Sequence, residues 1–177
     1  YNRASWKEVL HGVADAFQNR REEIEEQANN LVTHLANSNS FGADLLHNNL
    51  VPAHELFHSS MLEDMFVNIM KTADREWGGF GRAPKFPQTF VIRFLLQYYN
   101  STGNKEALDQ ACLSLDKMIM GGIYDHVGGG LARYSTDAEW LVPHFEKMLY
   151  DNALLLMALS DAYKITNREE YKIAIQE

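Results

Sequence analysis

Segment 121–151 holds the densest set of groups that could do acid–base chemistry. It opens with a glycine-rich loop, whose backbone freedom lets it line a pocket. It continues into a region rich in carboxyl and imidazole side chains, the groups that most often serve as general acids and bases, in glycosidases among other enzymes. The candidate catalytic residues are Asp125, His126, His144, Glu146 and Asp151.

Aromatic and cationic side chains in and before this segment suit a polyhydroxylated or anionic ligand. Prolines 84 and 87 stiffen the loop that carries Arg82 and Lys85 and would hold these two side chains in fixed directions. The structural alternative is that the cations pair with nearby carboxylates and that the polar cluster is a hydrogen-bond network fixing the loop. The candidate ligand-binding residues are Arg82, Lys85, Tyr124, Arg133, Tyr134, Asp137 and Trp140.

The segment His54-Glu-Leu-Phe-His58 matches the H-E-x-x-H motif of zinc peptidases. On a helix the motif places two imidazoles on one face, beside a glutamate that can activate a zinc-bound water. Residues 59–64 do not continue into the longer metzincin pattern, and nothing singles out a third ligand. We therefore interpret the motif as a polar helix start, and we predict neither a metal nor a cofactor.

Helical spacing of apolar residues extends over most of the chain and predicts an all-α protein. A capping box at Ser5 and Glu8 opens a first helix, which we expect to continue to about Ala36, before a polar loop at 37–52. Only 132–135 could form a short extended piece. The further predicted helices cover about 54–74, 87–99, 105–120 and 143–164, with a last one from about 168.

An internal repeat runs through this pattern. An offset of 64 residues pairs Leu95 with Leu159 and Gly103 with Asn167, and glycine-rich segments recur at an offset of 51. Each unit consists of a glycine-rich loop and a helical hairpin, and such hairpins need neighbours to bury their apolar faces. The helix after residue 143 is apolar nearly all round at 153–159, which predicts a buried inner helix. The pattern indicates part of a toroid of helix pairs.

Composition excludes several classes of function. The 177 residues include 24 acidic and 16 basic side chains, a net charge of −8, which disfavours binding to nucleic acid. No apolar run approaches the ~20 residues of a membrane span, and the single Cys112 excludes an internal disulfide. We expect a soluble, cytoplasmic protein. Because the chain opens at Tyr1 without a methionine and stops without a helix-stop signal, we interpret it as a fragment of a larger polypeptide.

Two long motifs resemble those of one protein family: Gly-Gly-Phe-Gly-Arg-Ala-Pro-Lys-Phe-Pro at 78–87, and the glycine-rich loop at 121–130 with the Trp-Leu-Val-Pro-His-Phe-Glu-Lys-Met-Leu-Tyr-Asp-Asn-Ala segment at 140–153. The chain resembles the spermatogenesis-associated, thioredoxin-domain-containing proteins and their bacterial YyaL-like relatives, most weakly over 37–65. The resemblance implies a thioredoxin-like domain, absent from this chain, followed by an (α/α)6 toroid of the six-hairpin glycosidase and N-acylglucosamine 2-epimerase type. Residues 1–177 would form the first portion of that toroid.

Two hypotheses about function follow. In the first, the toroid acts on carbohydrate: one of the candidate carboxylates is the acid or base of a glycoside hydrolase, or His126 and His144 are the proton-transfer pair of an epimerase. Arg82 and Arg133 would orient the ligand while Trp140 stacks on it. In the second, the toroid is a non-catalytic module that binds a ligand or partner and presents it to the thioredoxin-like domain. A zinc peptidase is the most remote alternative.

Overall fold

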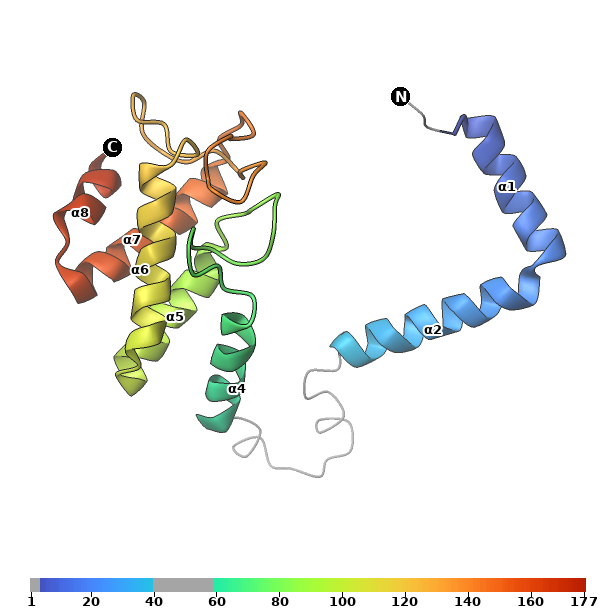
Figure 1. Cartoon of the computed structure of the whole chain (residues 1–177), viewed down its shortest axis with the longest axis horizontal. Coiled ribbons are helices and arrows are strands. Elements are labelled where there is room, and N and C mark those ends of the chain that lie inside the picture. Colours follow the sequence, from blue (N-terminus) through green and yellow to red (C-terminus); the bar gives the residue numbers. More distant parts are fainter. Residues whose placement is uncertain (1–3, 40–58) are drawn as a thin grey trace. The chain divides into compact units, whose positions relative to one another are not determined.

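The computed structural model describes residues 4–39 and 59–177 (Figure 1). The chain divides into two compact units, Tyr1–His58 and Ser59–Glu177. The H-E-x-x-H motif at 54–58 and the loop predicted at 37–52, from residue 40 onward, lie outside the described residues.

The first unit contains two helices, α1 (Trp6–Asn19) and α2 (Arg21–Asn39), where the sequence predicted one. The predicted capping box is confirmed, since the Ser5 hydroxyl accepts the Glu8 N–H at 3.3 Å and the Glu8 carboxylate accepts the Ser5 N–H at 2.6 Å. The break falls at Arg20, where φ is −133° and ψ is 35°. Residues 18–23 include no apolar side chain, so no apolar packing favours an unbroken helix there.

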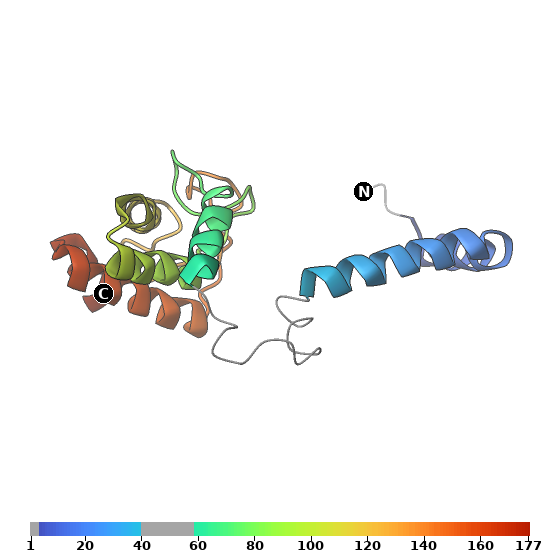
Figure 2. The same cartoon turned by 90° about the horizontal axis from the view of Figure 1, so that it is seen from below.

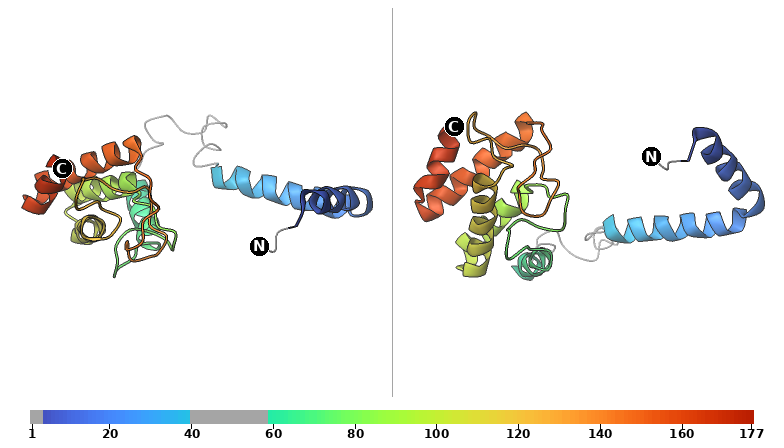
Figure 3. Two further views of the ribbon diagram at one scale, coloured as in Figure 1. Left: turned by 90° about the horizontal axis from the view of Figure 1, so that it is seen from above. Right: turned by 45° about the horizontal axis from the view of Figure 1, so that its top comes forward.

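The second unit contains α4 (Ser59–Met70), α5 (Thr89–Thr102), α6 (Lys105–Met120), α7 (Leu149–Thr166) and α8 (Glu169–Gln176). Helix α5 packs against α6 and α7, and α7 packs against α8 (Figures 1, 2 and 3). Fully buried side chains at these contacts include Ile92, Leu95, Leu115, Leu159 and Tyr171. Extended backbone in the described residues is limited to isolated bridges, two of them at Ser135, so the all-α prediction is confirmed.

Helix α7 differs from its prediction in two ways. It begins at Leu149 rather than after Pro143, because the preceding backbone pairs with an earlier loop: Arg133 N–H donates to Glu146 O and His144 N–H donates to Tyr134 O, both at 2.9 Å. Its buried face is narrow, and one side stays exposed in this unit. No helix within 4–39 or 59–177 combines the length and the apolar character that crossing a membrane requires.

The 64-residue repeat is confirmed by matching helix ends. Helix α5 ends at Gly103 with φ of 73°, and the Gly103 N–H donates to Tyr99 O at 2.7 Å. Helix α7 ends at Asn167 with φ of 53°, and the Asn167 N–H donates to Tyr163 O at 2.8 Å. Left-handed backbone at this position favours glycine or asparagine, so the sequence repeat reflects a repeated helix cap.

We expect Gly103→Ala to lower the free energy of unfolding by about 1–2 kcal/mol, the cost of left-handed backbone for a residue with a Cβ. A Cβ at this position would meet no atom within 4 Å, so the loss isolates the backbone conformation. Urea denaturation measures it, with Asn167→Gly as the matched variant that relieves the same conformation and should not destabilise. Equal stability of Gly103→Ala and the parent chain would contradict the cap.

Candidate functional site

The candidate site is built on two glycine-rich loops, the first loop at residues 72–81 and the second loop at residues 123–132. Both close with the same backbone hydrogen bonds at an offset of 51 residues, so they are two copies of one structure. The bonds run from Asp74 N to Gly79 O (3.0 Å) and Gly81 N to Thr72 O (2.8 Å), and from Asp125 N to Gly130 O (2.9 Å) and Ala132 N to Ile123 O (2.9 Å).

Glycine is required where each loop turns back. Gly79 has φ of 74° and Gly130 has φ of 80°, in the left-handed region. A Cβ at Gly79 would lie 2.5 Å from the Trp140 ring, and a Cβ at Gly130 would lie 2.8 Å from Asn152 Oδ1. These glycines therefore serve both the backbone conformation and close packing.

In the first loop, Asp74 joins the backbone to a buried lysine. Its Oδ1 accepts the N–H groups of Glu76 (2.9 Å) and Trp77 (2.8 Å), and its Oδ2 accepts a hydrogen bond from Lys85 Nζ at 2.6 Å. Burial opposes the ionisation of Asp74, but the bonds from Lys85 and the backbone lower its pKa overall. The lowered pKa keeps the Asp74 carboxyl group ionised beside the Lys85 nitrogen.

In the second loop, Asp125 makes the equivalent contacts with Lys147. Its Oδ1 accepts the N–H groups of Val127 (3.0 Å) and Gly128 (2.9 Å), and its Oδ2 accepts a hydrogen bond from Lys147 Nζ at 2.6 Å. The bond from Lys147, followed by the two backbone bonds, holds the pKa of Asp125 well below its usual range. Such a carboxylate stays ionised and is a poor proton donor.

The two Asp–Lys pairs differ in exposure. Side-chain exposure is 0% for Lys85 and 21% for Asp74, against 44% for Lys147 and 40% for Asp125. The Ala138 carbonyl accepts from Lys85 Nζ at 2.8 Å, and the buried Trp140 ring lies 5.3 Å from that nitrogen. Two predicted ligand-binding residues, Lys85 and Trp140, are thus interior structural residues in this unit.

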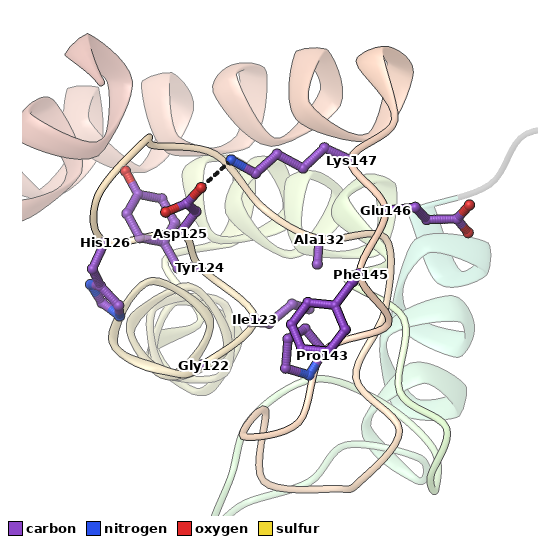
Figure 4. A pocket seen from close by; sticks show the side chains of 10 residues that line it. All are labelled: Gly122, Ile123, Tyr124, Asp125, His126, Ala132, Pro143, Phe145, Glu146 and Lys147. Atoms are coloured by element: carbon purple, nitrogen blue, oxygen red, sulfur yellow. Dashed lines mark hydrogen bonds and ion pairs between the residues drawn. The ribbon is translucent and has the colours of Figure 1, made fainter.

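The more exposed pair, Asp125–Lys147, borders a pocket of about 430 Å³. Figure 4 shows Asp125 and Lys147 directed toward one another on one side, with Phe145 and Pro143 on the other. The Glu146 carboxylate points away from that pair (Figure 4). The lining residues are Gly122, Ile123, Tyr124, Asp125, His126, Ala132, Pro143, Phe145, Glu146 and Lys147.

A second polar cluster lies in the loop before α7, and we call it the His144 cluster (Arg133, Tyr134, His144 and Glu146). Glu146 Oε1 accepts from Arg133 Nη1 at 3.2 Å and lies 3.3 Å from His144 Nδ1. The His144 ring stacks on Tyr134 with centroids 4.7 Å apart. The prediction that His144 and Glu146 share a helix with Asp151 is wrong, because α7 begins after them.

Asp151 lies in the first turn of α7. Its Oδ2 is buried and has no hydrogen-bond partner among the described residues. Burial raises the pKa of Asp151; the Arg133 charge opposes this shift and the Glu146 charge adds to it. A carboxyl group with a raised pKa holds its proton at higher pH, which a general acid requires.

The remaining candidates lie apart from the His144 cluster. The Tyr124 hydroxyl donates to Glu177 Oε2 at 2.7 Å, and burial, with this bond, raises the pKa of Tyr124 to about 12. The His126 ring is exposed, with Nε2 3.1 Å from Gly121 O. Asp137 accepts three backbone N–H groups of its own loop, and Arg82 is exposed.

Sequence reasoning missed Asp74, which no motif singled out. The 51-residue offset carries the signal, because it pairs Asp74 with Asp125 as well as the glycines. Phe86 was also missed; its ring lies 4.8 Å from Tyr134, and it adds an exposed aromatic surface beside the His144 cluster.

The fold matches a solved structure. A sugar epimerase from a ruminal bacterium superimposes on 66% of this chain and 35% of its own, with a TM-score of 0.56 and 21% sequence identity. This likeness confirms that the chain has the helical fold of an α/α toroid.

Comparison of the sequence with family models gives no match. Individual relatives do match: human spermatogenesis-associated protein 20 is 46% identical over 60% of this chain and 14% of its own length. The mouse protein of that name is 34% identical over 96% of this chain and 21% of its own length. The chain thus spans about a fifth or less of these relatives. By this similarity, as its motifs predicted, the chain belongs to the family of spermatogenesis-associated protein 20.

Proposed function

We propose that this chain contributes to a carbohydrate-active toroid, with Asp151 as the general acid and the His144 cluster as the ligand-facing surface beside it. The observation that carries the proposal is the buried, unpartnered Oδ2 of Asp151. A buried polar atom without a hydrogen-bond partner costs free energy. Its retention therefore points to a role with a bound ligand rather than in folding. The sugar epimerase of the same fold supports carbohydrate as the ligand class.

The proposed chemistry uses two carboxyl groups in unlike surroundings. Asp151, with its raised pKa, would donate a proton to a sugar oxygen or carbon. Glu146, which accepts from Arg133, would receive a proton on the other side of the reaction, and His144 at 3.3 Å would relay it. Hydrolysis and epimerisation both need such a donor and acceptor, so the proposal covers both.

Asp125 has a structural role in this proposal, because its Oδ1 accepts two N–H groups of the second loop and its Oδ2 accepts from Lys147. Aromatic surface for a sugar ring comes from Phe86 and Tyr134 rather than from the buried Trp140. We further propose that residues 1–177 belong to a single toroid domain. The protein would be cytoplasmic and would act together with a thioredoxin-like domain.

Asp151→Asn tests the proposed role. In the full-length protein, we expect turnover to fall about 100-fold, the usual loss when a general acid is removed. Proton NMR of glucose, N-acetylglucosamine, N-acetylmannosamine and cellobiose would detect epimerised and hydrolysed products together. Glu63→Gln, an exposed carboxylate on α4, is the control that should keep full activity. Equal turnover in the two variants would overturn the role of Asp151, and sugar binding without turnover would favour the non-catalytic module.

Stability separates loss of function from loss of fold. Because the folded pKa of Asp151 is raised above its ordinary 3.8, the native state binds more protons than the unfolded state. Its charge therefore destabilises the fold as pH rises above 3.8. We expect Asp151→Asn to increase the Tm at pH 7, and the difference to vanish as pH falls to 3. A variant that is inactive and also less stable at pH 7 would not support the assignment.

A further inference from the structure

The first and second loops share one structure, yet only the first is covered. Both pairs, Asp74–Lys85 and Asp125–Lys147, have an Nζ–Oδ2 distance of 2.6 Å and the same backbone bonds to the aspartate. The difference lies in what packs over the lysine.

Residues 135–140 form the cover of the first loop. Lys85 and Ser135 exchange backbone hydrogen bonds of 2.8 and 2.9 Å, which place the cover beside the lysine. The Ala138 carbonyl then accepts from Lys85 Nζ at 2.8 Å, and Trp140 Nε1–H donates to Trp77 O at 2.8 Å. This cover follows the second loop in sequence, so the second repeat closes the pair of the first.

In the second loop the carbonyl on the lysine comes from the loop itself, since Gly129 O accepts from Lys147 Nζ at 2.7 Å, and no described segment buries the pair as residues 135–140 bury the first. Asp125 and Lys147 are half-exposed and border the 430 Å³ pocket. Val127 in the second loop and Phe145 at the pocket are almost fully exposed. An ion pair beside large exposed apolar side chains is typical of a surface that another part of a protein buries.

We propose that the second loop is the docking surface for the corresponding cover of a third repeat. That cover would bury the Asp125–Lys147 pair and place an apolar or aromatic side chain in the pocket, as residues 135–140 with Trp140 bury the pair of the first loop. The first repeat supplies the precedent for this occupant. The relatives leave room for it, because this chain spans 14–21% of the human and mouse proteins. Repeat units of this kind bury their faces against neighbours.

Lysine acetylation of the full-length protein tests the proposal. Acetyl N-hydroxysuccinimide with mass spectrometry gives a rate for each lysine, and Lys164, whose side chain is 74% exposed, sets the rate of an accessible lysine. We expect Lys147 to react at least about tenfold more slowly than Lys164. Lys85, which has no exposed surface, should react as slowly and serves as the control that the first loop is intact. Labelling of Lys147 at the Lys164 rate, with Lys85 still protected, would overturn the proposal. Protection of Lys147 that is lost on dilution would also overturn it, since it would identify a second copy as the occupant.

Thermal unfolding of variants gives an independent measurement. If the cover is present, Lys147→Met leaves Asp125 buried without its partner, and we expect the Tm of the full-length protein to fall by on the order of 5 °C. Lys164→Met is the matched control and should change the Tm little. An equally small change in both variants would contradict the docking surface. Sugar turnover does not enter either test, so the result stands apart from the proposed function.

Discussion

Lys85→Met should lower the free energy of unfolding by about 3–5 kcal/mol, because it leaves the Asp74 carboxylate without its partner in a largely buried site. Lys85 has no exposed surface, and its Nζ bonds Asp74 Oδ2 at 2.6 Å and Ala138 O at 2.8 Å. The variant therefore loses two hydrogen bonds of a charged group at once. Urea denaturation followed by circular dichroism measures the change.

Two further variants make this result specific. Lys164→Met removes an exposed lysine and should cost less than about 1 kcal/mol. The double variant Asp74→Asn/Lys85→Met removes both charges and should recover part of the loss, because the remaining amide carries no charge to be stranded. A loss below 1 kcal/mol for Lys85→Met alone would show that the pair does not hold the first loop.

Trp140→Ala should also cost about 3–5 kcal/mol, the usual range for removing a large aromatic side chain from a core. The Trp140 side chain is fully buried, its Nε1–H donates to Trp77 O at 2.8 Å, and its ring packs against Gly79. Trp140→Phe keeps much of the packing and loses the hydrogen bond, so it should cost less, about 1–3 kcal/mol. Denaturation of both variants orders the two contributions.

A double-mutant cycle tests whether Lys85 and Trp140 stabilise the fold through their mutual contact. Since Trp140 lies over Lys85, the cost of Lys85→Met/Trp140→Ala should be smaller than the two single costs combined. Strict additivity would contradict the contact. A Trp140→Ala variant of full stability would return Trp140 to the ligand-binding role that the sequence predicted for it.

The sequence alone determined features that depend on neighbouring residues. Helix α6 was predicted at 105–120 and has those bounds, because Asn104 caps it locally by accepting the Ala107 N–H at 3.3 Å. The repeat was visible for the same reason, since Gly103 and Asn167 each end a helix through their own backbone conformation. The motifs also identified the family, and through it the toroid.

Only the tertiary structure decided which polar residues are buried and what they bind. Lys85 looked like a loop cation and Trp140 like a stacking platform, but residues 53 and 63 positions away accept their hydrogen bonds. The start of α7 depended on Glu146 O accepting the N–H of Arg133. Spacing along the chain encodes local caps and periodicity, whereas burial and the pKa of a group such as Asp151 depend on distant segments that only folding brings together.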